Sequence, residues 1–103
     1  MKLTPEQLPS LLARVSDWRW SAERGGTISR QYVFGDFAQA MGFMAQVAIV
    51  AERRNHHPEW FNVYHRVDVT LTTHDVGGLS LKDIELARFM DQVAAALAQQ
   101  PTE

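Results

Sequence analysis

The sequence has no cysteine, no block of like charge and no long hydrophobic run, and each absence excludes a class of protein. Without cysteine there can be no disulfide, thiolate zinc site, iron-sulfur cluster or cysteine nucleophile. Ten Lys and Arg against twelve Asp and Glu give a formal charge of −2, which argues against a strong electrostatic grip on nucleic acid or anionic lipid. No stretch approaches the roughly 20 apolar residues of a membrane span, and no signal-peptide pattern opens the chain. We therefore expect a cytoplasmic protein without direct contact to nucleic acid or membrane.

The residues that are present suit one compact domain. The chain has 103 residues, of which 46% are hydrophobic and 10% aromatic, enough for a core and too few for two domains. The sequence predicts a single domain over residues 1–103. A chain of this length buries only about two-thirds of its unfolded surface, so association with a second copy would add buried apolar area.

Capping and turn signals delimit the first half of the chain. Thr4 and Gln7 form a capping box that opens a short helix. Residues 18–22 and 28–34 alternate in polarity around a Gly-Gly turn and predict a β-hairpin. Asp36 then caps a long helix from Phe37 to Arg54.

The second half repeats the arrangement of two strands and a helix. Strands are expected at 61–64 and 67–73, joined by a tight connection at His65-Arg66. After a loop at 74–78, Ser80 and Asp83 form a second capping box that opens the last helix, and residues 99–103 are a frayed tail. The order is αββαββα. Hairpins that flank helices predict an α+β fold, with a four-stranded antiparallel sheet and the helices packed on one face.

The long helix is apolar on two sides. One stripe consists of Phe37, Met41, Met44, Ala48 and Ala51, and the other of Phe43, Val47 and Val50. A helix of this kind needs two partners. We expect one to be its own sheet and the other to be the same helix of a second subunit.

Three of the four histidines lie where regular elements end. His56 and His57 follow the long helix at Pro58, which forces the chain out of helical geometry, so both imidazoles are expected on a rigid turn and not on a buried face. His74 follows the strand 67–73. Such loop ends often hold catalytic side chains, and histidine exchanges protons near neutral pH. Three of them around one cleft could donate and accept protons in a single turnover.

Other interpretations of these histidines stay open. An adjacent pair at a helix C-terminus also suits a surface or capping role, because positive charge is favourable there. A zinc site is less well supported, since adjacent histidines point in different directions and no HExxH spacing completes a tetrahedron. A Ser-His-Asp hydrolase lacks a GxSxG motif, and Ser80 is explained as a helix cap. His65, in a polar connection, is expected to be solvated.

One spaced pattern is more specific than any single histidine. Its members are Glu52, His56-His57-Pro58, Tyr64, His74 and Asp83. With the surrounding residues 56–64 and 73–74, the pattern resembles the pterin-4a-carbinolamine dehydratase family, whose mammalian members are also dimerisation cofactors of a homeodomain transcription factor.

The resemblance implies a hydro-lyase that removes water from a 4a-hydroxytetrahydropterin and yields quinonoid dihydropterin. This reaction recycles the pterin of aromatic amino acid hydroxylases, so phenylalanine hydroxylase is an expected companion enzyme. The pterin is then the substrate, and neither a cofactor nor a metal is implied. Elimination needs one proton delivered to the departing hydroxyl and another removed from N5, and imidazoles suit both tasks.

The family pattern also implies roles for individual residues. His56, His57 and His74 match the acid-base set, with the division of roles left open. The substrate-binding positions implied by the resemblance are Pro58, Trp60, Thr72, Thr73 and Asp75.

The remaining members of the pattern have structural explanations. Asp83 is expected to complete the cap at Ser80. Glu52 either orients an imidazole or is solvated, and Tyr64 is expected to be structural or orienting. Trp60, Thr72 and Thr73 could equally be ordinary core and strand residues.

Two alternatives to the dehydratase follow from the same resemblance. The first is a non-catalytic oligomeric interaction module, acting as the mammalian relatives do toward their transcription factor. The second is a pterin-related role in molybdopterin metabolism. The family also implies a homo-oligomer, a dimer through the sheet edge or a tetramer through the long helix Phe37 to Ala51.

Overall fold

A computed structural model describes residues 1–98, and its element order is the predicted αββαββα with three short 3-10 turns inserted. The elements are α1 (Leu8–Leu12), η1 (Ala13–Val15), β1 (Arg19–Ser21), η2 (Glu23–Gly25), β2 (Thr27–Val33), α2 (Phe37–Arg53), β3 (Glu59–Val63), β4 (Arg66–Leu71), η3 (His74–Val76) and α3 (Leu81–Ala98). The tail predicted at 99–103 lies outside the described residues.

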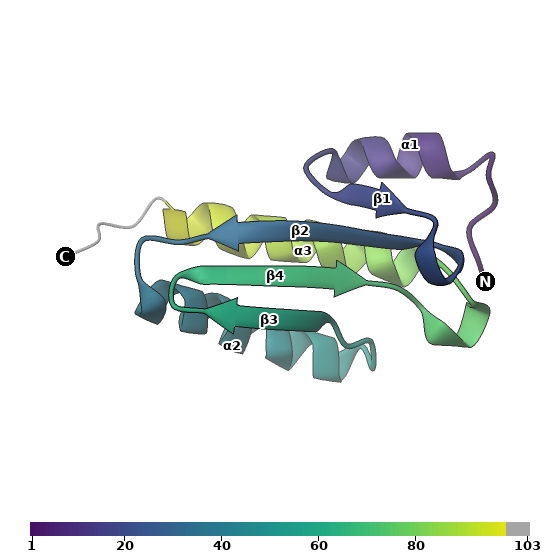
Figure 1. Cartoon of the computed structure of the whole chain (residues 1–103). Helices are drawn as coiled ribbons and strands as arrows, with labels where there is room; N and C mark the ends of the chain where they lie inside the picture. Colours follow the sequence, from purple (N-terminus) through teal and green to yellow (C-terminus); the bar gives the residue numbers. More distant parts are fainter. Residues whose placement is uncertain (99–103) are drawn as a thin grey trace.

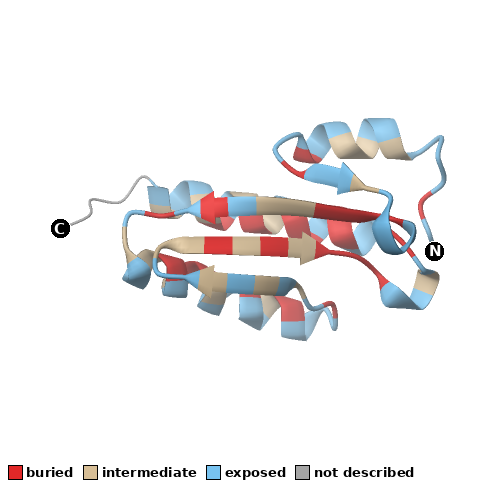
Figure 2. Cartoon of the chain, viewed as in Figure 1, coloured by how far each residue is buried: buried red, intermediate tan, exposed pale blue. Residues whose placement is uncertain are grey.

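The sheet has the strand order β1-β2-β4-β3, and every neighbouring pair is antiparallel. Helices α2 and α3 run over one face of it, while α1 lies beyond β1 (Figure 1). Buried side chains concentrate on the central strands β2 and β4 and on the helix faces turned toward them (Figure 2). The predicted α+β fold is confirmed.

The capping box of Thr4 and Gln7 forms completely, although α1 begins only at Leu8, and the box at Ser80 forms in part. Gln7 Oε1 accepts from Thr4 N at 2.9 Å, and Thr4 Oγ1 accepts from Gln7 N at 3.3 Å. The side chain of Asp36 caps α2 by accepting from Gln39 N. At α3 the Asp83 carboxylate accepts from Ser80 N at 2.9 Å. The Ser80 hydroxyl does not complete this box, because it bonds Thr73 instead.

Helix α2 has two apolar faces, as expected, but their membership differs at several positions, since Ala40 is also buried and Met44 packs against the core. Its buried residues are Ala40, Phe43, Val47 and Ala51. Ala51 was expected on the other stripe. It belongs to the core because it follows Phe43 and Val47 in steps of four residues, which keeps it on the same face. Phe37 and Met41 remain about half exposed.

All four strand boundaries in the second hairpin differ from the prediction, and β3 begins at Glu59, two residues earlier than expected. β4 ends at Leu71, two residues early, because its pairing with β2 ends at Ile28 and Leu71. The Thr72 hydroxyl that follows donates to Gly26 O at 2.8 Å. Thr73 keeps only an isolated bridge to Gly78. The connection between β3 and β4 lies at Tyr64-His65 instead of His65-Arg66, since Val63 pairs with Arg66. Tyr64 adopts a left-handed φ of 50° there.

The end of α2 sets the position of the adjacent histidines. His56 N donates to Ala51 O at 3.0 Å and Asn55 N donates to Glu52 O at 3.1 Å. Asn55 has a φ of 50°, and these two bonds around a left-handed residue form a Schellman motif. Through this motif the backbone reverses at Asn55 and brings His56 back against the end of the helix.

Substitutions at Asn55 test this termination. Asn55→Gly should unfold at the same urea concentration as the wild type or slightly higher, because glycine adopts the left-handed conformation freely. Asn55→Val should lose about 1 to 2 kcal/mol of unfolding free energy, because a side chain branched at Cβ resists that conformation. Equal unfolding midpoints for the two variants, measured by circular dichroism, would contradict the assignment.

Candidate functional site

The three histidines of the pattern lie at one end of the sheet, where α2 ends, β3 begins and β4 ends (Figure 1). Two side-chain bridges join the segment that holds His56 and His57 to the segment that holds His74. One runs from His56 through Asp83 to Thr73, the residue before His74. The other runs from Glu59, two residues after His57, to His74.

Asp83 is the centre of the first bridge. Its side chain is fully buried and accepts from three partners: His56 Nε2 at 2.6 Å, Thr73 Oγ1 at 2.7 Å and Ser80 N at 2.9 Å. The predicted capping role is therefore confirmed, but it is only one of three contacts. A buried carboxylate requires such partners, because an unpaired one would favour its neutral form. Asp83 thereby ties the end of α2 and the loop after β4 to the start of α3.

The expectation that both adjacent imidazoles lie off any buried face is wrong for His56. This residue is only 8% exposed, since the Schellman turn directs it toward Asp83. His57 is exposed, and its Nε2 lies 2.8 Å from Glu52 Oε1. Of the two roles left open for Glu52, contact with an imidazole is the one observed, although the carboxylate itself is largely exposed.

His74 has a carboxylate neighbour that sequence reasoning missed. Glu59 Oε2 lies 3.5 Å from His74 Nε2, and both carboxylate oxygens of Glu59 accept from Arg24, each at 2.9 Å. The bidentate hydrogen bond from Arg24 lowers the pKa of Glu59 below its usual value. Glu59 therefore stays charged beside His74. Its position after His56-His57-Pro58 could have drawn attention to Glu59, but nothing local in the sequence links Arg24 to it.

The implied substrate-binding residues lie around these histidines in different environments. Pro58 is half-buried directly after His57, and Asp75 is exposed in η3. Trp60 is partly buried and packs against the hydrophobic core. The hydroxyls of Thr72 and Thr73 are buried and already bonded, the first to Gly26 O and the second to Asp83.

Tyr64 and His65 lie away from this end of the molecule. Tyr64 follows the last residue of β3, at the opposite end of that strand from Glu59. Its ring packs against the imidazole of His65 with centroids 4.3 Å apart. The expectation that His65 is solvated is wrong for its Nδ1, which is buried and has no hydrogen-bond partner among the described residues.

Within residues 1–98, no group of three or more His, Asp or Glu side chains is arranged to hold a metal ion. No helix of that region is long and apolar enough to cross a bilayer.

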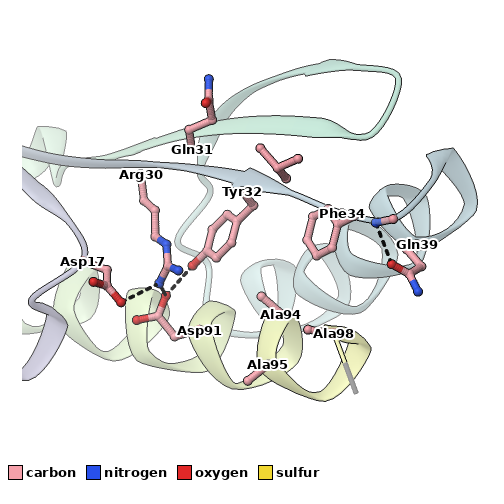
Figure 3. Close-up of a pocket in the computed structure, with 12 residues that line it drawn as sticks. Asp17, Arg30, Gln31, Tyr32, Phe34, Gln39, Asp91, Ala94, Ala95 and Ala98 are labelled. Atoms are coloured by element: carbon pink, nitrogen blue, oxygen red, sulfur yellow. Dashed lines mark hydrogen bonds and ion pairs between the residues drawn. The ribbon is translucent and has the colours of Figure 1, made fainter. Parts of the chain in front are cut away.

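A second polar cluster lies between β2 and α3 (Figure 3). Asp91 Oδ1 accepts from Trp18 Nε1 at 3.0 Å, from Arg30 Nη1 at 2.7 Å and from the Tyr32 hydroxyl. Burial and the Asp91 hydrogen bond raise the pKa of Tyr32 far above its ordinary value, so its phenol stays protonated and donates. These groups satisfy one another beside a cavity of about 710 Å³. We interpret these hydrogen bonds as structural contacts that hold α3 against the sheet.

Residues 1–93 match the protein family described as "Pterin 4 alpha carbinolamine dehydratase". The chain belongs to this family. A relative from Burkholderia multivorans, named "Putative pterin-4-alpha-carbinolamine dehydratase", is 57% identical over 95 residues, which cover 91% of each chain. A relative of the same name from Bradyrhizobium is 50% identical over 97 residues and covers 94% of this chain and 97% of its own.

Solved structures of related proteins share the fold. The "transcriptional coactivator/pterin dehydratase" from Brucella melitensis superposes with a TM-score of 0.85 at 45% identity and covers 91% of this chain and 99% of its own. A pterin dehydratase-like protein described as a RuBisCO assembly factor in the alpha-carboxysome gives a TM-score of 0.66 at 22% identity, over 76% of this chain and 89% of its own. At that identity the likeness concerns the fold alone. The predicted membership of the dehydratase family is thus confirmed.

Replacement of Asp83 tests its structural role. Asp83→Asn should lower the unfolding free energy by about 2 to 3 kcal/mol, because the amide cannot accept from His56 Nε2–H, Thr73 and Ser80 N together and leaves a buried donor unpaired. Urea denaturation measures the loss. Glu85→Gln, an exposed acid on the same helix, is the matched control and should stay within about 0.5 kcal/mol of the wild type. A wild-type midpoint for Asp83→Asn would refute the role of its carboxylate.

Proposed function

We propose that this protein removes water from a 4a-hydroxytetrahydropterin by histidine acid-base catalysis. The observation that supports the proposal most is the pairing of the two exposed imidazoles, His57 and His74, with the carboxylates of Glu52 and Glu59 at one end of the sheet. Imidazoles that contact carboxylates and remain open to solvent are suited to proton exchange with a bound substrate. Membership of the dehydratase family supports the same reaction.

The chemistry requires two proton transfers and no change of oxidation state. The bond between C4a and the hydroxyl oxygen breaks as an imidazolium donates a proton to that oxygen, which leaves as water. A neutral imidazole accepts the N5 proton, and the N5 electron pair forms the C4a=N5 double bond of quinonoid dihydropterin. After this step one histidine has lost a proton and the other has gained one. Proton exchange with solvent returns both to their starting states.

The environments of the histidines suggest how the proposed roles are divided. His57 and His74 are the exposed members, with side chains that are 57% and 75% exposed, so we assign proton transfer with the substrate to them. His56 commits its Nε2 to Asp83 in the interior. We therefore propose that His56 holds the segment bearing His57 in position, with only its other ring nitrogen left for the substrate.

The proposed pterin surface combines Pro58, Trp60 and Asp75 with the backbone of Thr72 and Thr73. Both threonine hydroxyls and the Thr73 main-chain N–H have partners already, so the main chain of Thr72 is left to pair with the amide edge of the pterin. The proposal needs no metal and no cofactor besides the pterin substrate. It implies a companion aromatic amino acid hydroxylase, such as phenylalanine hydroxylase, and a cytoplasmic location.

We also propose that the protein is a homo-oligomer. Strand β3 forms an edge of the sheet and exposes Phe61 and Val63, and α2 exposes Phe37, Met41 and Ile49. Apolar side chains in such groups favour burial against a partner. The α2 surface also supports the second candidate function, an interaction module, since it would be available to another protein if it were not covered by a copy of itself.

Light scattering after size exclusion tests the oligomer. The wild type should elute as a multiple of the 11.7 kDa chain mass, and Met41→Glu should reduce that multiple, because it puts a charge into the covered surface. Gln92→Glu adds the same charge at an exposed polar position of α3, outside the proposed surface, and should leave the mass unchanged. A monomeric wild type at tens of micromolar chain would contradict the proposal.

Stopped-flow absorbance tests the reaction. 4a-Hydroxytetrahydropterin generated by phenylalanine hydroxylase should decay faster when a catalytic amount of the protein is present, and EDTA should leave the acceleration unchanged. His57→Ala and His74→Ala should each reduce kcat by about a hundredfold or more, the usual size of general acid-base contributions. His65→Ala, at the other end of β3, should retain the wild-type rate.

Two results would count against this assignment. Folded His57→Ala and His74→Ala variants that work as fast as the wild type would remove these residues from the chemistry. Wild-type protein that does not exceed the spontaneous rate would favour the interaction module or a pterin role elsewhere, including molybdopterin metabolism.

A further inference from the structure

A cavity of about 770 Å³ lies beside η3, on the side of the loop where α1 and the start of α3 approach it. Two of its lining residues, Thr73 and Asp75, belong to the proposed pterin surface. Its apolar lining includes Leu3, Leu11 and Leu81. A volume of this size suits a small organic ligand.

Three cationic side chains from three different segments line this cavity. They are Lys2 in the N-terminal segment, Arg14 in η1 and Lys82 in the first turn of α3. Within the described part of the chain, none of the three forms an ion pair. Against one lining carboxylate, Asp75, they leave an excess of two positive charges. The chain as a whole carries a formal charge of −2, so this is a local reversal of sign.

Backbone contacts fix the N-terminal segment that carries Lys2. Leu3 N donates to Leu79 O at 2.8 Å, which fixes the N-terminal segment against the loop before α3. The stem of Lys2 then crosses Gly78 so closely that a Cβ built there would fall 2.6 Å from Lys2 Cε. Arg14 lies on the same face of α1 and η1 as Leu11, three residues earlier. The three cations therefore come from three segments of the fold that meet at this cavity, and not from one loop.

We propose that this cavity binds the phosphate group of a ligand, and that the ligand is a pterin whose side chain carries phosphate. Lysine and arginine bind phosphate oxygens through charge-assisted hydrogen bonds, which favours an anion with several acceptors. The pterin assignment rests on the proposed function, because it relies on the ring lying near Thr73 and Asp75. The apolar lining would contact the carbon chain between ring and phosphate.

Titration calorimetry of the full chain at low salt tests the proposal with three probes: neopterin, neopterin monophosphate and inorganic triphosphate. Neopterin monophosphate should bind more tightly than neopterin. Arg14→Gln and Lys82→Gln should each weaken its binding about two- to fivefold, the size expected of one exposed ion pair, and leave neopterin unaffected. Arg88→Gln, which removes an exposed cation from α3 outside the cavity lining, is the matched control and should change neither affinity.

The outcomes separate this inference from the proposed function. Equal affinity for neopterin and its monophosphate, or an equal loss in Arg88→Gln and Arg14→Gln, would overturn the phosphate site even if the protein dehydrates an unphosphorylated substrate. The pterin assignment would be overturned by a different result: Arg14→Gln and Lys82→Gln weaken triphosphate binding, but neopterin monophosphate binds no more tightly than neopterin. Failure to bind either pterin, together with no dehydration, would instead reject the proposed function.

Discussion

The buried Asp83 carboxylate connects the segments on which the candidate site depends. It bonds His56 after α2, Thr73 after β4 and the backbone of Ser80 at the start of α3. These segments are far apart in the sequence, and each carries or adjoins a residue of the site. A charge without solvent requires its hydrogen bonds, so the three segments are held in one relative position. The segments that carry His57 and His74 are therefore positioned by contacts of the neighbouring residues His56 and Thr73.

Carboxylates recur around the imidazoles, but in environments that suit different tasks. His56 contacts Asp83 in the interior, whereas His57 and His74 contact Glu52 and Glu59 at the surface. An interior pair is fixed by its neighbours, while an exposed pair can be opened by a substrate that competes for the imidazole. In this account one histidine, His56, positions a segment, while the other two, His57 and His74, exchange protons.

Local signals predicted most of the fold, and long-range contacts account for what they missed. The capping residues Asp36 and Asp83 marked helix starts correctly, because their bonds reach only three residues along the chain. The Thr4–Gln7 contacts also form, but α1 begins only at Leu8. The burial of His56 was not predictable from Pro58 and the helix end, since it depends on Asp83, 27 residues away. The bonds from Arg24 to Glu59 span 35 residues and leave no local pattern. The spaced histidine pattern indicated the family, but it also includes Tyr64, which the fold carries to the far end of β3.

The most direct test of a pterin site formed by the exposed histidines is heteronuclear NMR of the imidazole groups during titration with 7,8-dihydrobiopterin, which resembles the product and cannot lose water. The ring signals of His57 and His74 should shift together with one dissociation constant and show contacts to pterin protons, while His65 stays unchanged. Pterin binding that leaves both His57 and His74 unmoved, or that shifts His65 alone, would contradict the site.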